Sequence, residues 1–178
     1  MHTPGHSAAP SLKECSQLFG NSEWSPLAAF LAVTEALQMI HHSHHWQTAG
    51  HEFYGNHLLF QRLYEGIAPE VDLVGEKLIG LSNDPKLTNY FARVAAVKKF
   101  MEKVTKPGLS YLVVSLLAEK VYLELGKELV GSLGNKSPGL ENMIAGILDT
   151  HESHVYLLQQ AVVQQRKSKV AATTGKEQ

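Results

Sequence analysis

Two pairs of residues of the kind that bind metal ions constrain this chain more than any other feature of its sequence. His45 and His57 flank a turn at Gly50, and Asp72 and Glu76 are four positions apart, so both carboxylates project from one face of a helix. If one helix runs from His57 to Asp72, these fifteen positions cover about 22 Å at about 1.5 Å per residue. A metal site is only a few ångströms across. One chain therefore cannot close the site, whereas a two-fold related copy with its second helix antiparallel would bring the histidines of one subunit to the carboxylates of the other.

Apolar residues recur at helical spacing in four long segments, and a shorter amphipathic pattern lies between the second and the third. The first segment opens with Ser25 and Pro26, a proline position typical of a helix start. We therefore predict an all-α, four-helix antiparallel bundle with a short extra helix. The first long segment begins near residue 25, and the second has an apolar seam over residues 53–78. The short amphipathic pattern covers 89–104. The third long segment covers about 108–134, and the fourth begins at 137.

Composition favours one domain with two polar ends. We predict a flexible N-terminal tail over residues 1–22, a folded domain over 23–165 and a polar, mildly basic C-terminal tail over 166–178. The 16 Lys and Arg residues balance 17 Asp and Glu residues, which gives no overall basic field to attract nucleic acid. Cys15 stands alone, and the sequence shows neither a signal peptide nor a membrane-spanning run. We therefore expect a cytoplasmic protein.

The run HHWQTAGHEFYGNHLLFQRLYEGIAPEVDLVGEKL resembles the Dps mini-ferritins, which belong to the ferritin-like superfamily. The family pattern is a His-Trp near the end of the first helix, a Gly turn, a second His twelve residues after the first, and Asp-x-x-x-Glu on the second helix. His45, His57, Asp72 and Glu76 reproduce these intervals of twelve, fifteen and four. The resemblance extends over roughly residues 25–165 and implies a ferritin-like bundle.

The resemblance also implies an activity. The protein is expected to be a ferroxidase that oxidises Fe²⁺, preferably with H₂O₂ but also with O₂, and that stores ferric mineral in a hollow dodecamer built from two-fold dimers. Such a shell protects against oxidative stress. His45, His57, Asp72 and Glu76 are the expected catalytic iron ligands, with Zn²⁺ as a possible surrogate, and their mixed nitrogen and oxygen set suits ferrous iron. Trp46 is expected beside the site.

Other functions stay open. Arg166, Lys167, Lys169 and Lys176 form a modest basic group, so a structural nucleoid protein is one alternative, although we expect weak DNA binding. A His-rich bundle that sequesters Zn²⁺ or Cu²⁺ is another. An intrachain di-iron centre is disfavoured, because none of the fourteen Glu residues is followed three positions later by His.

Besides His2 and His6 in the N-terminal tail, six further histidines have no assigned role. We interpret four of them as surface residues or as residues behind the ligands. The other two lie on or near the apolar face of the last helix and are interpreted as core histidines, although one of them could supplement the site. The first group is His41, His42, His44 and His51, and the second is His151 and His154.

Overall fold

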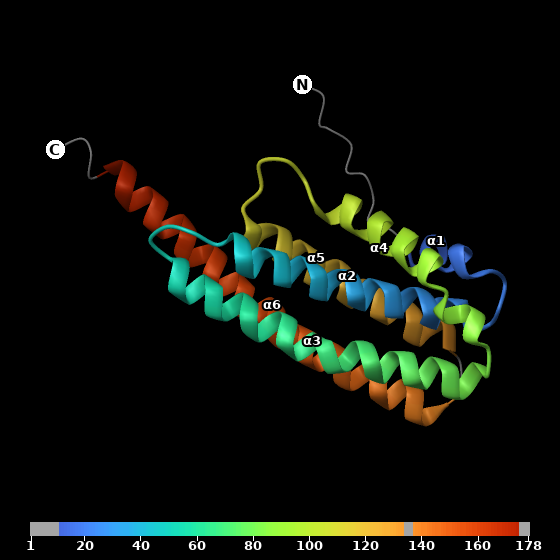
Figure 1. Cartoon of the computed structure of the whole chain (residues 1–178). Helices are drawn as coiled ribbons and strands as arrows, with labels where there is room; N and C mark the ends of the chain where they lie inside the picture. The colour runs from blue at the N-terminus through green and yellow to red at the C-terminus, as the bar shows by residue number, and fades with distance from the viewer. Residues whose placement is uncertain (1–10, 134–136, 175–178) are drawn as a thin grey trace, which may run out of the picture.

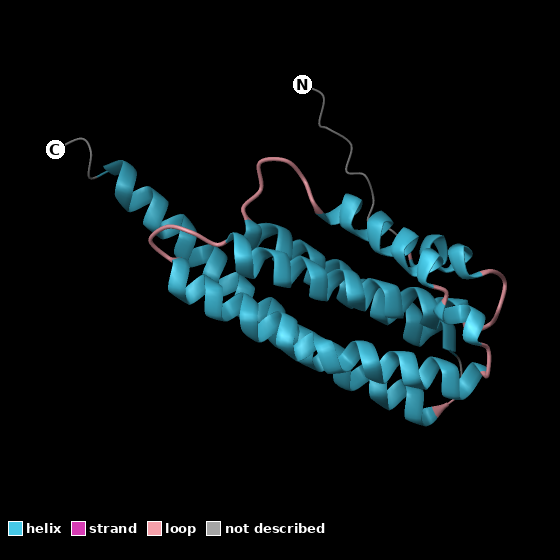
Figure 2. Ribbon diagram, viewed as in Figure 1, coloured by secondary structure: helices cyan, strands magenta, loops and turns pink. Residues whose placement is uncertain are grey.

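The structure, a computed structural model, describes residues 11–133 and 137–174, and its regular elements there are all helical (Figure 2). None of the described helices is long and apolar enough to cross a membrane. The elements are α1 (Leu12–Ser16), the 3₁₀ helix η1 (Gln17–Phe19), α2 (Ser25–Gln47), α3 (Phe53–Ser82), the 3₁₀ helix η2 (Pro85–Thr88), α4 (Tyr90–Val104), α5 (Tyr111–Leu133) and α6 (Pro138–Thr174).

Four of these helices form the predicted bundle. Helix α2 packs against α3 and α5, and α6 packs against the same two helices from the other side. Neighbouring helices run antiparallel, so α3 and α5 run in the same direction, and the chain returns along the outside of the bundle through α4 (Figure 1). The fold prediction, including the short extra helix between the second and third long helices, is confirmed.

Helix α3 is the element on which the spacing argument depends. It is one continuous helix of 30 residues, with Pro69 inside it, and it ends at Asn83 in the left-handed conformation with φ 49°. Because the helix is unbroken from His57 to Asp72, the separation of about 22 Å along its axis holds in the folded chain.

The core of the bundle has a polar layer between two apolar clusters. The larger cluster fills one half of the bundle around the stacked rings of Phe30 and Tyr122. The smaller cluster fills the other half around Phe60 and Leu158. Along α6, His151 and His154 lie between residues of the two clusters and are buried. The prediction that these two are core histidines is confirmed.

Within the described residues, parts of both predicted tails are helical. Residues 12–19, assigned to a flexible tail, form α1 and η1 and bury Leu12 and Cys15 in the larger cluster. The backbone N–H of Leu12 also donates to Glu128 at 2.8 Å. A segment of one or two turns is too short to show a helical period, which is why the pattern missed it. At the other end, α6 continues past residue 165 to Thr174, while the predicted end of the third long helix at 134 lies outside the described residues.

Gly126 gives a test of how tightly α5 and α6 pack. A Cβ atom at this buried position would lie 2.3 Å from Cδ2 of Leu148, whereas a Cβ at the exposed Gly131 of the same helix meets nothing within 4 Å. We expect Gly126→Ala to lower the free energy of unfolding by about 1–3 kcal/mol, because Leu148 must move. Gly131→Ala should raise that free energy slightly, because alanine favours helix. Urea unfolding of both variants checks this, and equal stabilities would contradict the packing.

Candidate metal centres

The histidine pair, His45 and His57, joins the end of α2 to the start of α3. Nδ1 of His45 donates to the carbonyl oxygen of His57, and Nδ1 of His57 donates to the carbonyl oxygen of His45, both at 3.0 Å. The two rings stack with centroids 3.7 Å apart and are half-buried. Because a carbonyl oxygen only accepts, the proton of each neutral ring is on Nδ1, and Nε2 keeps its lone pair. Histidines held in this way through one nitrogen are suited to bind a metal through the other.

The carboxylate pair, Asp72 and Glu76, lies about five turns further along the surface of α3. Both side chains are exposed and line one hollow together with Glu35 and Arg93. The structure thus keeps the histidine pair and the carboxylate pair apart within one chain. Each pair is available to a second copy.

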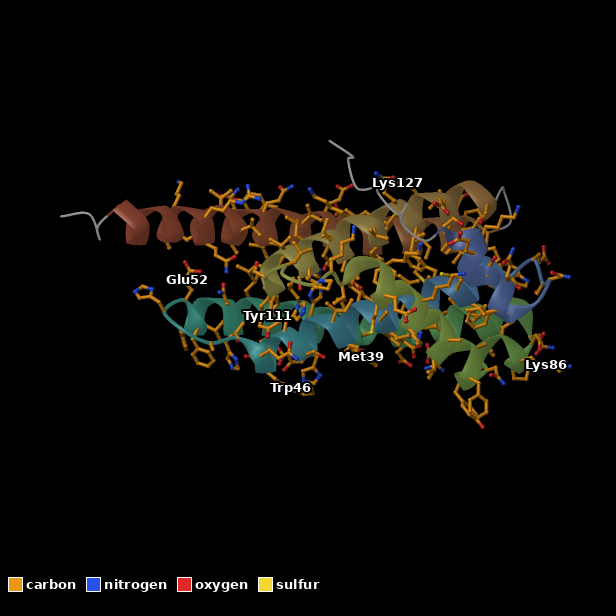
Figure 3. The ribbon with its side chains drawn as sticks, turned by 90° about the horizontal axis from the view of Figure 1, so that it is seen from above. Met39, Trp46, Glu52, Lys86, Tyr111 and Lys127 are labelled. Carbon is orange, nitrogen blue, oxygen red and sulfur yellow. The ribbon has the colours of Figure 1, made fainter. Side chains whose placement is uncertain are left out.

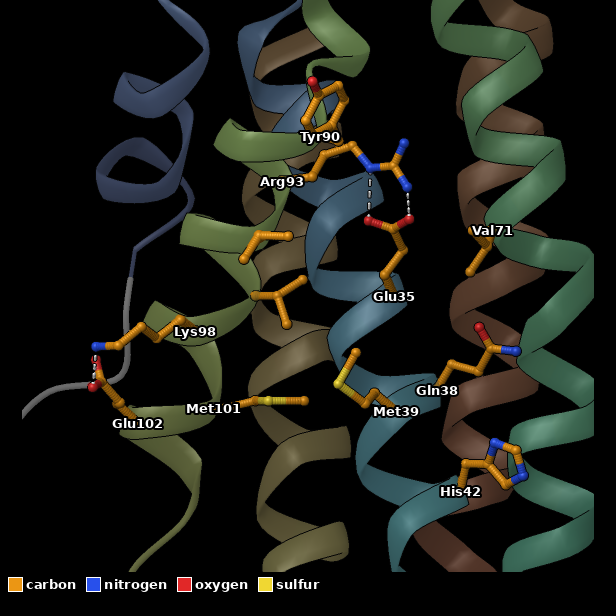
Figure 4. Close-up of a pocket in the computed structure, with 12 residues that line it drawn as sticks. Glu35, Gln38, Met39, His42, Val71, Tyr90, Arg93, Lys98, Met101 and Glu102 are labelled. Atoms are coloured by element: carbon orange, nitrogen blue, oxygen red, sulfur yellow. Dashed lines mark hydrogen bonds and ion pairs between the residues drawn. The ribbon is translucent and has the colours of Figure 1, made fainter.

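A groove between α2 and α4 adjoins that hollow (Figure 4). Arg93 of α4 forms a two-point ion pair with Glu35 of α2, in which Nε donates to Oε2 at 2.9 Å and Nη2 donates to Oε1. These two residues line both hollows, so the groove and the carboxylate pair form one continuous surface. The groove is also lined by the exposed apolar residues Met39 and Val94.

Trp46, which was expected beside the site, points outward from the end of α2 (Figure 3). Its side chain is 69% exposed, and its ring lies 4.1 Å from that of His42, which in turn stacks on Tyr64. Within one chain Trp46 therefore packs on a neighbouring histidine, and its role at a shared site stays a prediction.

A second group of potential ligands lies inside the bundle, where sequence reasoning did not place one. We call it the buried cluster, and it draws on all four long helices. Its members are His41 of α2, Glu70 of α3, Glu119 of α5, and His151 and His154 of α6. The ligand atoms of Glu119, His151 and His154 all lie within 4.8 Å of one another.

Glu119 is the centre of this cluster. Its Oε1 accepts from Nε2 of His41 at 2.8 Å and from Nδ1 of His154 at 3.2 Å, and its Oε2 accepts from Nδ1 of His151 at 2.6 Å. Burial alone would raise the pKa of the Glu119 carboxyl. The hydrogen bonds from His151, His154 and His41 outweigh that effect and hold the pKa well below its usual range, so the group is an anion.

His151 compensates part of that charge. Its Nε2 lies 2.8 Å from Glu70 while its Nδ1 faces Glu119, and both carboxylates accept, so both ring nitrogens carry protons. Burial opposes the charge of His151, but the hydrogen bonds to Glu119 and Glu70 raise its pKa to about 9. The metal-free cluster is therefore held together by an imidazolium between two carboxylates.

A chain of hydrogen bonds leads from the cluster to His44. His41 donates from Nε2 to Glu119, so its Nδ1 accepts from the Ser115 hydroxyl at 3.0 Å. The Ser115 oxygen in turn accepts from Nδ1 of His44 at 2.7 Å. Burial lowers the pKa of His41, although its hydrogen bond to Glu119 has the opposite effect. Burial, together with the field of His41, lowers the pKa of His44 to about 4.

Only part of the buried cluster has a signal in the sequence. We interpreted His41 and His44 as surface residues or as residues behind the ligands of the shared site. The surface assignment was wrong, because both side chains are buried in the core. The absence of Glu-x-x-His argues against an intrachain di-iron centre. Helix α6 instead carries His151-x-x-His154, which places two imidazoles on one face, and the two carboxylates come from separate helices. The clue in the sequence was that His151 and His154 lie on or near the apolar face of the last helix.

The chain has the ferritin-like four-helix fold that Dps proteins share. A Dps protein from Vibrio cholerae O1, a member of a broad superfamily of ferritin-like diiron-carboxylate proteins, matches with a TM-score of 0.65 at 16% identity, over 85% of this chain and 90% of that one. A histidine-to-glycine double mutant of Listeria innocua Dps matches with a TM-score of 0.61 at 14% identity, over 87% and 96%. General stress protein 20U of Bacillus subtilis (strain 168) is 27% identical over 121 residues, which are 66% of this chain and 81% of that protein. No protein-family model matches.

His44 makes the stability of the metal-free protein depend on pH. The unfolded chain binds a proton here below about pH 6.5, whereas the folded chain resists protonation until about pH 4. Neutral His44 therefore makes its full contribution to the free energy of unfolding above about pH 6.5. This contribution is lost as the pH falls towards 4. The loss is about 3 kcal/mol, at about 1.4 kcal/mol per pKa unit.

We expect His44→Gln, which cannot titrate, to flatten the dependence of unfolding free energy on pH between 6.5 and 4. The slope should not vanish, because the pKa of His41 is lowered as well. Urea unfolding in the presence of a chelator measures the slope, and His51→Gln, at an exposed position, serves as control. Identical slopes in the parent and His44→Gln would contradict the assignment.

Proposed function

We propose that this protein is an iron-storing ferroxidase that oxidises Fe²⁺ with H₂O₂ at sites shared between two subunits of a hollow shell. The ferritin-like fold supports iron as the substrate. The proposed ligands of each site are His45 and His57 of one subunit and Asp72 and Glu76 of its partner. This is a mixed imidazole and carboxylate set that suits ferrous iron.

The observation that carries the proposal is the reciprocal hydrogen bonding of the histidine pair. Both Nδ1 atoms donate to backbone carbonyls, so in the neutral rings the lone pair is on Nε2 and can bind the ion. In the Listeria innocua Dps variant, the two histidines changed to glycine have the same separation in sequence as His45 and His57.

The exposed surface around the carboxylate pair supports a second copy as the partner. Large apolar side chains are exposed at the groove between α2 and α4 and beside it, notably Met39, Tyr90, Phe91 and Val94. Exposed apolar surface of this kind marks an interaction site. A two-fold copy seated there would cover the groove and bring its own histidine pair towards Asp72 and Glu76, and we propose that such dimers build the shell.

The reaction balances without a resident cofactor. Each of two Fe²⁺ ions gives up one electron, and the two electrons break the O–O bond of one H₂O₂. The ferric ions then take oxygen from peroxide and water into the mineral and release protons. The chain's own residues bind and orient the ferrous ions, and both iron and peroxide are consumed in the same step.

Loss of one ligand should separate catalysis from folding. We expect His57→Ala or Asp72→Ala to leave helicity and assembly intact, because neither residue is in the apolar core, and to lower the rate of Fe²⁺ oxidation by about tenfold or more. Absorbance of the ferric product measures the rate. His51→Ala and Glu124→Ala, at exposed positions, are matched controls and should oxidise iron at the parent rate. Parent rates in both ligand variants would rule out this site.

Mixed assembly tests whether the site is shared between subunits. One variant carries His45→Ala and His57→Ala, the other carries Asp72→Ala and Glu76→Ala, and either one alone lacks half of every site. In a mixed two-fold dimer one site collects both defects and the other is complete. We therefore expect co-expression to restore ferroxidase activity that neither variant has. Background activity in assemblies shown by mass spectrometry to be mixed would mean that the sites do not lie between subunits.

A further inference from the structure

We propose that the buried cluster is a second metal site, closed within one chain, that binds one divalent transition-metal ion between Glu119, His151 and His154. This site is distinct from the shared site and does not rest on the proposed function. It uses other residues, lies inside the bundle, and needs no partner subunit.

The distances fit an ion after a small movement. The three ligand atoms lie within 4.8 Å of one another. Metal bonds of about 2.0–2.2 Å at tetrahedral angles place ligand atoms about 3.4 Å apart, so the widest pair would close in by about 1 Å while the hydrogen-bonded pairs of Glu119 open slightly. His41 is a fourth candidate ligand, because its Nε2 and Nδ1 of His154 contact the same Oε1 atom of Glu119.

The remaining polar residues hold the ligands in the orientation that a metal requires. If Nδ1 of His151 binds the ion, its Nε2 keeps a proton and donates to Glu70, which already lies 2.8 Å away. A carboxylate behind a ligating histidine is the usual arrangement at such centres. If Nε2 of His41 binds, its proton moves to Nδ1 and is donated to Ser115. The Ser115 hydroxyl then donates to Nδ1 of His44, which requires the His44 proton to move to Nε2.

Charge also favours an ion at this site. Two carboxylic side chains lie in a core that excludes water, and buried anions are costly unless positive partners are in place. A divalent ion between Glu119, His151 and His154 would supply such a partner at the centre of the cluster. Apolar residues would pack this layer at less cost, so the retention of five ionisable side chains between two apolar clusters indicates a functional site.

The ligand chemistry limits the identity of the ion. Imidazole nitrogens with a single carboxylate suit Fe²⁺, Co²⁺ or Zn²⁺, whereas Mg²⁺ and Ca²⁺ prefer all-oxygen sites. The most exposed members of the cluster are Glu70 and His154. Gly66 of α3 lies beside Nε2 of His154 and has no side chain to cover it. A Cβ atom at this position would lie 3.9 Å from that nitrogen. The side between α3 and α6 is therefore the route by which an ion enters.

The test uses Co²⁺ alone and the full chain carrying His45→Ala and His57→Ala, which removes the shared-site histidines. After chelation, this chain should bind one Co²⁺ per subunit and show the d–d absorption of an imidazole-ligated ion. Adding His151→Gln or His154→Gln should weaken Co²⁺ binding by about tenfold or more. Glutamine at 154 still offers an N–H to Glu119, which favours folding. His42→Gln, outside the cluster, is the control and should bind as the parent does.

The outcomes separate clearly. If the chain without His45 and His57 binds no stoichiometric Co²⁺, the cluster is an ionic network held by protons and the proposal fails. If folded cluster variants bind as tightly as the parent, the ion sits elsewhere and the proposal also fails. Should both cluster variants unfold, X-ray absorption of the Co²⁺-loaded chain decides, since the site requires at least two imidazole ligands. Ferroxidase activity plays no part, so failure of the shared site leaves this result intact.

Discussion

The bundle is organised around one carboxylate that accepts from three imidazoles. Glu119 is fully buried, and burial of an anion is costly unless its partners are in place. Those partners come from α2 and α6, and through His151 the network reaches Glu70 of α3, so four helices meet at one polar layer. The layer fixes how the helices are rotated and shifted against one another, because a helix displaced by one turn would leave a charge unpaired.

A second constraint is the length of α3. Its 30 unbroken residues hold the histidine pair and the carboxylate pair several turns apart on one rigid element, so neither pair forms a complete metal site. The chain thus has one group of potential ligands in its core and two separate pairs on its surface. Under the proposals above, the core group would serve a single subunit, whereas the two pairs would form a complete site only between subunits.

The long helices, the histidine pair and the carboxylate pair could be predicted from the sequence, whereas the buried cluster could not. Helical periods identify α2, α3, α5 and α6, and the interval between His57 and Asp72 translates directly into distance along an axis. The cluster depends on which faces of four helices meet, and spacing within one helix carries no information about the rotation of its neighbour. Glu119 illustrates this, since its three partners are 32 to 78 positions away in sequence. The short α1 was missed because a single turn has no period.

The hydrogen bonds of the histidine pair also link metal binding to the loop between α2 and α3. His45 and His57 each clamp the other's backbone, and the Thr48 hydroxyl donates to the same carbonyl oxygen of His45. An ion on Nε2 withdraws electron density from the ring and makes each Nδ1–H a stronger donor. Residues 48–52 would then be held more firmly when iron is present, so amide hydrogen exchange in this loop reports occupancy of the half-site, and unchanged exchange on loading would show that the clamp does not sense the metal. If the histidine pair binds iron as proposed, the segment that joins α2 and α3 would therefore respond to the ion.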